Sequence, residues 1–354
     1  MKTFHILDWP SYRYYSDSHP LHRWQSKLKD HNIKVNFFYD HQHEKLKNAD
    51  CIFVHSRYFE HGWQDVAKRN SQNEADLMQW LGEMRNVTSR LVWFDAADST
   101  GSADFPIINL VDGFVKKQVH KDLSLYTQPE KLRVWVDTEP SKPENSFEPC
   151  PVHDLHKIKV GWNIGLNDYR YFGYKMSRLS NYLSYSLYQN KYRPVESQRQ
   201  FDLTFRGRIH TDSSNKVSWQ RNEVLKLITS LNRNIATGQP VDKKLYWKEL
   251  SESKLSISPF GWGEVCYRDF ESFISGAVLI KPSMEHLITY PDVYKEGETY
   301  LPVSWQLNDL KDKLEYALDN YSLLKQIAQN GQERYRKTVD DGEAFVNVVK
   351  SIMK

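Results

Sequence analysis

The chain has 354 residues, of which 40% are hydrophobic and 26% are charged, a composition typical of globular proteins. The length predicts two domains, because a single hydrophobic core stops growing near about 250 to 300 residues. The formal net charge is only +3, which argues against a protein whose main task is to coat nucleic acid.

The three cysteines are widely spaced and form no zinc-type motif, a usage that favours a reducing compartment. No stretch approaches the roughly 20 apolar residues that cross a bilayer, and the N-terminal apolar run is too short for a signal peptide. We therefore expect a cytoplasmic protein. A peripheral position at the inner face of the membrane stays open.

Short apolar runs alternate with amphipathic stretches over about the first 125 residues, which is the pattern of βαβ units. Predicted strands cover residues 4–7, 34–39, 51–55, 91–94, 107–110 and 113–116, and predicted helices cover 22–30 and 73–86. Together they predict an open parallel sheet with helices on both faces.

Residues 128–151 are rich in proline and charge and predict a connecting segment, followed by a helix within 174–188. The βα alternation then restarts, with strands expected at 202–209, 255–258 and 278–280 and helices at 219–231, 307–320, 322–339 and 343–353. We expect an N-terminal domain at 1–150, a C-terminal domain at 151–330, and a final helix at 331–354 that packs back toward the first domain.

The stretch SPFGWGEVCYRDFESFISG, residues 258–276, places a glycine-rich turn between a predicted strand and a predicted helix. Gly261 and Gly263 allow close approach of a ligand, and the positive end of a helix favours an anion. The spacing of Glu264, Arg268 and Glu271 places all three on one face of the expected helix. There an arginine can hold a phosphate, and a carboxylate can accept two hydrogen bonds from the hydroxyl groups of a ribose. An ordinary surface pair explains the charges about equally well.

This stretch, extended to residue 282, resembles the donor-binding motif of GT-B glycosyltransferases, in particular the exostosin-like and related bacterial polysaccharide enzymes. The matching positions are Ser258, Pro259, Gly261, Gly263, Arg268, Glu271 and Gly276. The resemblance implies that Glu271 binds the nucleotide ribose, and that Arg268 and the backbone of 261–264, with Glu264, lie beside the diphosphate or sugar. Six residues separate Glu264 from Glu271, where many retaining members have seven, which leaves the stereochemistry open.

Arg206 and Arg208 end a predicted strand close to this turn. The resemblance implies that they contact the donor phosphates, although an alternating strand with both arginines in solvent is nearly as good an explanation. Such cations would neutralise a leaving diphosphate without a metal. Asp292, Glu296 and Glu298 lack a DxD pattern, so we expect no obligatory metal and no cofactor.

WFDAADSTGSADF follows a strand of the N-terminal half and places Asp98 and Asp95 at the expected ligand edge of its sheet. A carboxylate there can act as the general base that takes the proton of an acceptor hydroxyl. Asp98 is the first candidate and Asp95 the second, with Asp8 and His19 in reserve. The same residues are also typical of a turn and a helix cap.

The aromatic loop DWPSYRYYSDSHPLHRW predicts an acceptor site, because aromatic rings stack on sugars while Arg and His supply polar contacts. Arg13, Tyr14 and His19 are its candidate acceptor-binding residues. The lysines of KKQVHK, residues 116, 117 and 121, would touch an anionic acceptor or a lipid, or form an ordinary solvated face.

The sequence has no P-loop, no serine-hydrolase elbow and no GxGxxG. We expect an α/β protein of GT-B architecture, with two Rossmann-like domains facing across a cleft. The expected activity is that of a hexosyl- or related transferase, which moves a sugar from a nucleotide sugar to a carbohydrate or glycolipid acceptor in surface polysaccharide synthesis. The alternatives are a non-catalytic nucleotide- or sugar-binding module and a membrane-associated assembly subunit of the same fold. No nucleic acid partner is expected.

Overall fold

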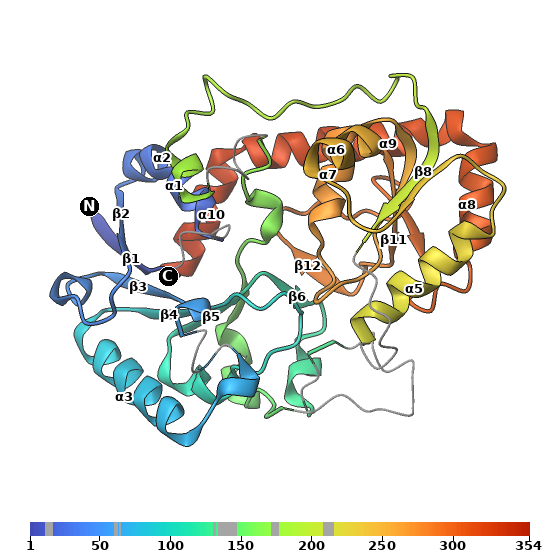
Figure 1. The fold of residues 1–354 in the computed structure, drawn as a ribbon. Coiled ribbons are helices and arrows are strands. Elements are labelled where there is room, and N and C mark those ends of the chain that lie inside the picture. Colours follow the sequence, from blue (N-terminus) through green and yellow to red (C-terminus); the bar gives the residue numbers. More distant parts are fainter. Residues whose placement is uncertain are drawn as a thin grey trace.

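The computed structural model describes residues 1–10, 17–59, 63, 65–129, 132–133, 147–170, 177–207 and 216–354. Each half of the chain builds one parallel sheet, and helices pack against both sheets (Figure 1). The predicted α/β class with two sheet domains is confirmed.

The first sheet has the strand order β2-β1-β3-β4-β5-β7, with every neighbouring pair parallel. Its strands are β1 (Lys2–Leu7), β2 (Ile33–Phe38), β3 (Cys51–His55), β4 (Leu91–Asp95), β5 (Gly113–Lys116) and β7 (Ile158–Val160). The accompanying helices are α1 (His19–Arg23), α2 (Gln25–Asp30) and α3 (Ser71–Val87). Because β7 belongs to this sheet, the first domain runs past the predicted boundary at residue 150.

The strand predicted at 107–110 is wrong, because these residues lie in a 3-10 helix, Phe105–Leu110. Pro106 occupies the first turn of that helix, a position that its fixed backbone angle favours.

The second sheet has the order β13-β11-β10-β8-β9, again with parallel neighbours. Its strands are β8 (Phe201–Arg206), β9 (Ile235–Gly238), β10 (Ser253–Ile257), β11 (Val278–Pro282) and β13 (Leu301–Val303). The helices are α5 (Lys216–Thr229), α6 (Lys243–Ser251), α7 (Tyr267–Ser275) and α8 (Leu310–Asp319). Strands β9 and β13, of 4 and 3 residues, were not predicted from the sequence.

The α-helix predicted within 174–188 is also wrong for the described residues. They form a 3-10 helix, Ser177–Tyr182, followed by turns. Serine side chains explain the interruption: the Ser184 hydroxyl contacts the Ser186 hydroxyl at 2.7 Å and accepts from the Ser186 amide at 3.3 Å. Such local bonds compete with the helical ladder.

The C-terminal helices join the two halves. Helix α9 (Tyr321–Asp340) crosses toward the first domain, and α10 (Gly342–Ile352) lies beside α2 (Figure 1). The Phe345 ring of α10 lies 5.6 Å from that of Trp24. One hydrophobic cluster contains Phe53 and Phe94 of the first sheet together with Phe270 of α7. The predicted start of the final segment, residue 331, falls inside α9.

A two-stranded antiparallel sheet also links the halves. It pairs β6 (Gln118–His120) with β12 (Leu287–Thr289). The rings of His120 and His286 lie 6.2 Å apart at this link, and the His286 ring packs edge-on against Trp305 at 4.7 Å. Burial lowers the pKa of His120 to about 4 and that of His286 to about 3.

The halves meet again at a backbone contact. A Cβ added to Gly263, in the turn after β10, would lie 1.6 Å from the carbonyl oxygen of Asp98, in the turn after β4. No side chain fits between two backbones at that separation, so glycine is required here by close approach. No helix among the described residues is both long and apolar enough to cross a membrane.

The buried histidines predict a loss of stability in mild acid. Their pKa values are lower in the folded than in the unfolded chain, so their contribution is complete above about pH 6.5 and is lost as the pH falls toward 4. His286→Phe should reduce the loss between pH 7.5 and pH 5 by about 2 kcal/mol, because a phenyl ring takes up no proton. Urea unfolding at both pH values measures it. The exposed-site control His156→Gln should behave as wild type, and an unchanged pH dependence in His286→Phe would contradict the assignment.

The backbone contact predicts a steric effect of Gly263→Ala. The added methyl group forces the two turns apart, so we expect a loss of about 1 to 3 kcal/mol in urea unfolding. Gly82→Ala, in α3, is the matched control: its methyl group would meet nothing within 4 Å, and alanine favours a helix by up to about 1 kcal/mol. Equal midpoints for the two variants would show that the turns do not depend on this contact.

Candidate active site

A cavity of about 320 Å³ lies where the carboxyl ends of the second sheet meet the first domain. Ligands of open α/β sheets bind at this edge. The cavity, called the donor pocket below, is lined by Asp98, Ile164, Arg221, Tyr246, Pro259, Gly261, Trp262, Gly263, Val265, Cys266, Tyr267, Arg268 and Glu271. The structure therefore brings together Asp98, Gly261, Gly263, Arg268 and Glu271 from the residues that the sequence singled out.

A buried aspartate holds the glycine-rich turn in place. The carboxylate of Asp269 accepts hydrogen bonds from the Ser258 hydroxyl at 2.6 Å, the Tyr294 hydroxyl at 2.7 Å and the Cys266 amide at 2.9 Å. The Lys281 ammonium lies 3.1 Å away and balances its charge. These contacts tie the turn to β11 and to the start of α7, which orients the pocket wall.

Glu271 lies on α7 in the wall of the donor pocket and is only 7% exposed. The Tyr246 hydroxyl, from α6, donates a hydrogen bond of 2.6 Å to Glu271 Oε2. Burial and the neighbouring Glu271 charge raise the pKa of Tyr246 well above its usual value, so Tyr246 stays a neutral donor. The carboxylate is thus oriented before any ligand enters.

Two arginines face the same cavity. Arg268 donates to the carbonyl oxygen of Arg206, and its guanidinium carbon lies 5.0 Å from the centre of the Phe205 ring. Arg221, on α5, lies beside Gly261: a Cβ added to Gly261 would be 3.2 Å from Arg221 Nη2. Within the described part of the chain, the Arg221 side chain forms neither an ion pair nor a hydrogen bond.

Burial, with a smaller effect of the Arg268 charge, lowers the pKa of the Arg221 guanidinium, which nevertheless stays charged. A half-buried cation without a carboxylate, next to a second cation, is an environment that favours an anionic ligand. Arg221 was not among the candidate residues predicted from the sequence. The available signal was its place near the start of the helix that follows β8, at the ligand edge of the sheet.

Arg206 does not line the donor pocket. Its guanidinium makes a two-point ion pair with Glu249 of α6, at 2.7 and 2.8 Å. The side chain of a residue at the end of a strand can point toward the cavity or away from it. Here the ion pair with Glu249 holds the Arg206 side chain away from the cavity. Arg208 lies outside the described residues.

Glu264 does not face the cavity either. Its carboxylate is fully buried and accepts from the Thr100 amide at 3.1 Å and the Thr100 hydroxyl at 2.9 Å. Burial raises the pKa of this carboxyl group. The expectation of one charged helix face was wrong for this member, because α7 begins only at Tyr267 and Glu264 belongs to the turn.

The two candidate bases have different surroundings. Asp98 lines the donor pocket from the first domain, and its Oδ1 lies 3.2 Å from both Arg57 Nη2 and Lys117 Nζ. Asp95 is fully buried, with Lys116 Nζ at 2.5 Å and the Ser102 hydroxyl at 2.7 Å. The structure therefore places Asp98, and not Asp95, where a ligand can reach it.

The remaining first-domain candidates lie elsewhere. His19 is buried, with its ring nitrogens 2.6 Å from Asn181 Oδ1 and 2.7 Å from the Tyr185 hydroxyl, and burial lowers its pKa to about 4. Asp8 is buried and accepts from the Ser18 hydroxyl at 2.8 Å. Both are therefore packed groups, outside the donor pocket. Arg13 and Tyr14 lie outside the described residues.

The expected basic surface at 116–121 is wrong for its first two lysines. Lys116 is paired with Asp95, and Lys117 with Asp17 and Asp98, and both lysines are buried. The described residues contain no group of three or more His, Cys, Asp or Glu side chains that could hold a metal ion.

Comparison with known proteins shows what the chain is similar to. Residues 192–340 match the family model described as glycosyl transferase-like. An alpha-glucosyltransferase (AGT) in complex with UDP has a similar structure, with a TM-score of 0.52 and 9% identity over 100% of each chain. An alpha-glucosyltransferase with UDP and a 13-mer DNA containing a HMU base has a TM-score of 0.51 and 8% identity over 100% of each chain. No curated protein matches the sequence.

At such low identity the two structures establish the fold alone. The family match covers the β8 to α9 region, which carries the glycine-rich turn and both pocket arginines. The narrower exostosin-like resemblance stays a prediction. The chain therefore has the GT-B glycosyltransferase fold, and its second domain is glycosyl transferase-like in sequence.

Proposed function

We propose that the protein is a glycosyltransferase that holds a nucleotide-sugar donor in the donor pocket and transfers the sugar to a carbohydrate or glycolipid acceptor. The observation that carries the proposal is Arg221, a half-buried cation that has no partner among the described residues and lies beside Gly261 and Arg268. A donor diphosphate is the anion that such a pocket in a GT-B fold would take.

The remaining pocket residues suit the rest of a nucleotide. The Glu271 carboxylate, oriented by Tyr246, would accept hydrogen bonds from the two ribose hydroxyls. Trp262 is 57% exposed at the pocket and offers a ring face for stacking. Arg221 and Arg268 would stabilise the charge that develops on the leaving diphosphate, and for that reason we expect turnover without a divalent metal.

Asp98 is the proposed general base. It would accept the proton of an acceptor hydroxyl while that oxygen attacks the sugar carbon and the nucleoside diphosphate departs. Its position supports this role, because it comes from the first domain and reaches the cavity that the second domain builds. Arg57 and Lys117 hold its carboxylate in place. A surface polysaccharide as the product rests on the sequence resemblance.

Arg221→Ala and Arg268→Ala should weaken nucleoside diphosphate binding. A hydrogen bond to a charged group is worth about 1.5 to 3 kcal/mol, so we expect roughly a 10- to 100-fold increase in Kd for each variant. Titration calorimetry with UDP, GDP and ADP measures it. Arg233→Ala is the matched control, because Arg233 pairs with Asp319 away from the pocket. The proposal fails if none of the nucleotides binds, or if both pocket variants bind as the control does.

Asp98→Asn should separate chemistry from donor binding. The amide keeps the shape of the side chain but accepts no proton, so transfer should fall by about 10²- to 10⁴-fold. The Kd of the nucleoside diphosphate should stay within about threefold. The measurement pairs product formation from labelled nucleotide sugars with calorimetry. Full activity in Asp98→Asn would end the base assignment, and a wild-type protein that binds nucleotide without any turnover would indicate a binding module.

A further inference from the structure

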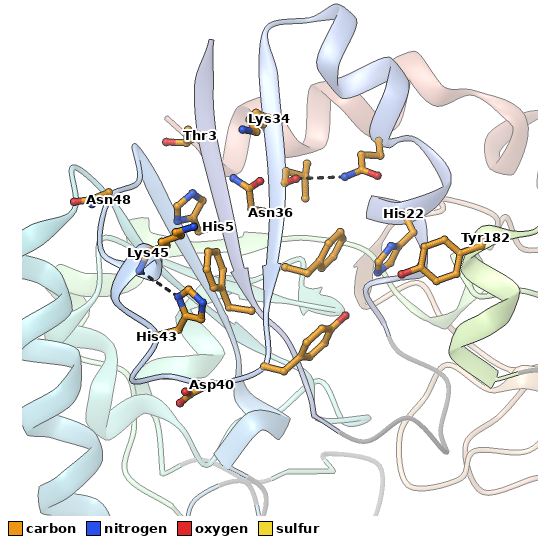
Figure 2. Close-up of a pocket in the computed structure, with 15 residues that line it drawn as sticks. Thr3, His5, His22, Lys34, Asn36, Asp40, His43, Lys45, Asn48 and Tyr182 are labelled. Carbon is orange, nitrogen blue, oxygen red and sulfur yellow. Dashed lines mark hydrogen bonds between the residues drawn. The ribbon is translucent and has the colours of Figure 1, made fainter.

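A second and larger groove lies on the first domain, along its edge strand β2 (Figure 2). Its volume of about 1030 Å³ extends to both sides of β2, because Val35 and Phe37 line it as well as Lys34 and Asn36. It shares no lining residue with the donor pocket. The groove lies on an outer strand that pairs on only one side, with β1.

Rings form the floor of this groove at one end. The Phe38 ring lies 4.9 Å from the His5 ring and 5.2 Å from the His43 ring. Lys34, Asn36 and Phe38 alternate along β2 and therefore point to the same side of the strand. Figure 2 shows Lys34 and Asn36 on the side of the strand where His5, Lys45 and Asn48 also lie.

Four hydrogen-bond donors around the floor have no partner within the part of the chain that the structure describes. They are the side chains of Lys34, Asn36, Lys45 and Asn48. Their neighbours are engaged: His5 Nδ1 lies 3.0 Å from the Leu46 carbonyl oxygen. A ring floor surrounded by unused amide and ammonium groups is suited to a ligand with apolar faces, hydroxyl groups and negative charge.

An oligosaccharide with acidic substituents has this combination: its ring faces stack on aromatic side chains, amides bind its hydroxyls, and ammonium groups bind its carboxylates or phosphates. The charge around the groove argues against nucleic acid. Lys34 and Lys45 are opposed by Asp40 among the lining residues, whereas binding of nucleic acid depends on many phosphate contacts.

One end of the groove lies at the carboxyl edge of the first sheet, the edge from which Asp98 reaches the donor pocket. Asp40 and His41 follow β2 at the carboxyl edge of the sheet, and the Tyr58 hydroxyl contacts the His41 amide at 3.0 Å. Arg57, adjacent to Tyr58, reaches Asp98 at 3.2 Å. Strands β2 and β4 are three strand spacings apart, about 14 Å. A chain of sugars along β2 would therefore extend toward Asp98.

We propose that this groove binds an acidic oligosaccharide and holds the non-reacting part of a polymeric acceptor, whose end lies at Asp98. The proposal rests on the proposed function for the acceptor role, but binding at the groove is measured independently of transfer and of the donor pocket.

The test uses the full chain and titrates four probes at low salt: hexagalacturonate, galacturonate monomer, the neutral maltohexaose and a single-stranded oligothymidylate. Hexagalacturonate should bind most tightly, and galacturonate monomer far more weakly. Lys34→Gln combined with Lys45→Gln should raise the Kd of hexagalacturonate roughly fivefold or more, an effect that 0.5 M NaCl should largely remove.

Asn36→Ala combined with Asn48→Ala should weaken the binding of hexagalacturonate and of maltohexaose alike, because both oligosaccharides carry hydroxyl groups. Lys34, Lys45 and Asn48 are exposed and Asn36 is half-buried, so folding should be preserved.

Lys226→Gln combined with Lys244→Gln is the control for net charge, since both lysines are exposed on helices of the second domain and neither lines the groove. The proposal is overturned if hexagalacturonate binds no better than maltohexaose, if oligothymidylate binds more tightly, or if the control pair weakens binding as much as the groove pair. Nucleoside diphosphate affinity should be unchanged in every groove variant, so a failure at the groove leaves the donor pocket untouched, and the reverse also holds.

Discussion

The contact between two turns determines the geometry of the site. The turn after β10 carries Gly263 against the Asp98 carbonyl oxygen, and the next residue, Glu264, is buried against Thr100. These contacts bring the carboxyl edges of the two parallel sheets together. Because the edges meet, Asp98 of the first domain completes a cavity whose other walls come almost entirely from the second.

Charge is divided between structural and ligand-binding roles around that contact. Asp269 with Lys281, Arg206 with Glu249, and Asp95 with Lys116 are paired inside the protein and stabilise turns, helices and strand ends. Arg221 is left without a described partner. The two charges of a buried ion pair neutralise each other, so only cations outside such pairs are available to bind an anionic donor.

Local patterns identified the parts of the fold in which sequence and structure agree. The strands from β1 to β5 alternate with helices, and the glycine-rich turn of residues 258–266 leads into α7 as expected. The predictions were wrong where partners distant in the sequence determine the direction of a side chain. Arg206 forms an ion pair with Glu249. Glu264 accepts a hydrogen bond from Thr100, which lies 164 positions before it in the chain. Arg221 was overlooked because nothing adjacent to it in sequence marks a ligand site.

The sequence by itself determined the two α/β halves and the strand–turn–helix element, because hydrophobic period and turn residues act over a few residues. Only the tertiary structure decided which charged residues face the cavity. Side-chain direction at a strand end or in a turn costs little locally, so distant partners such as Glu249 and Thr100 settle it. The donor pocket is therefore encoded in local motifs but assembled by contacts between the domains.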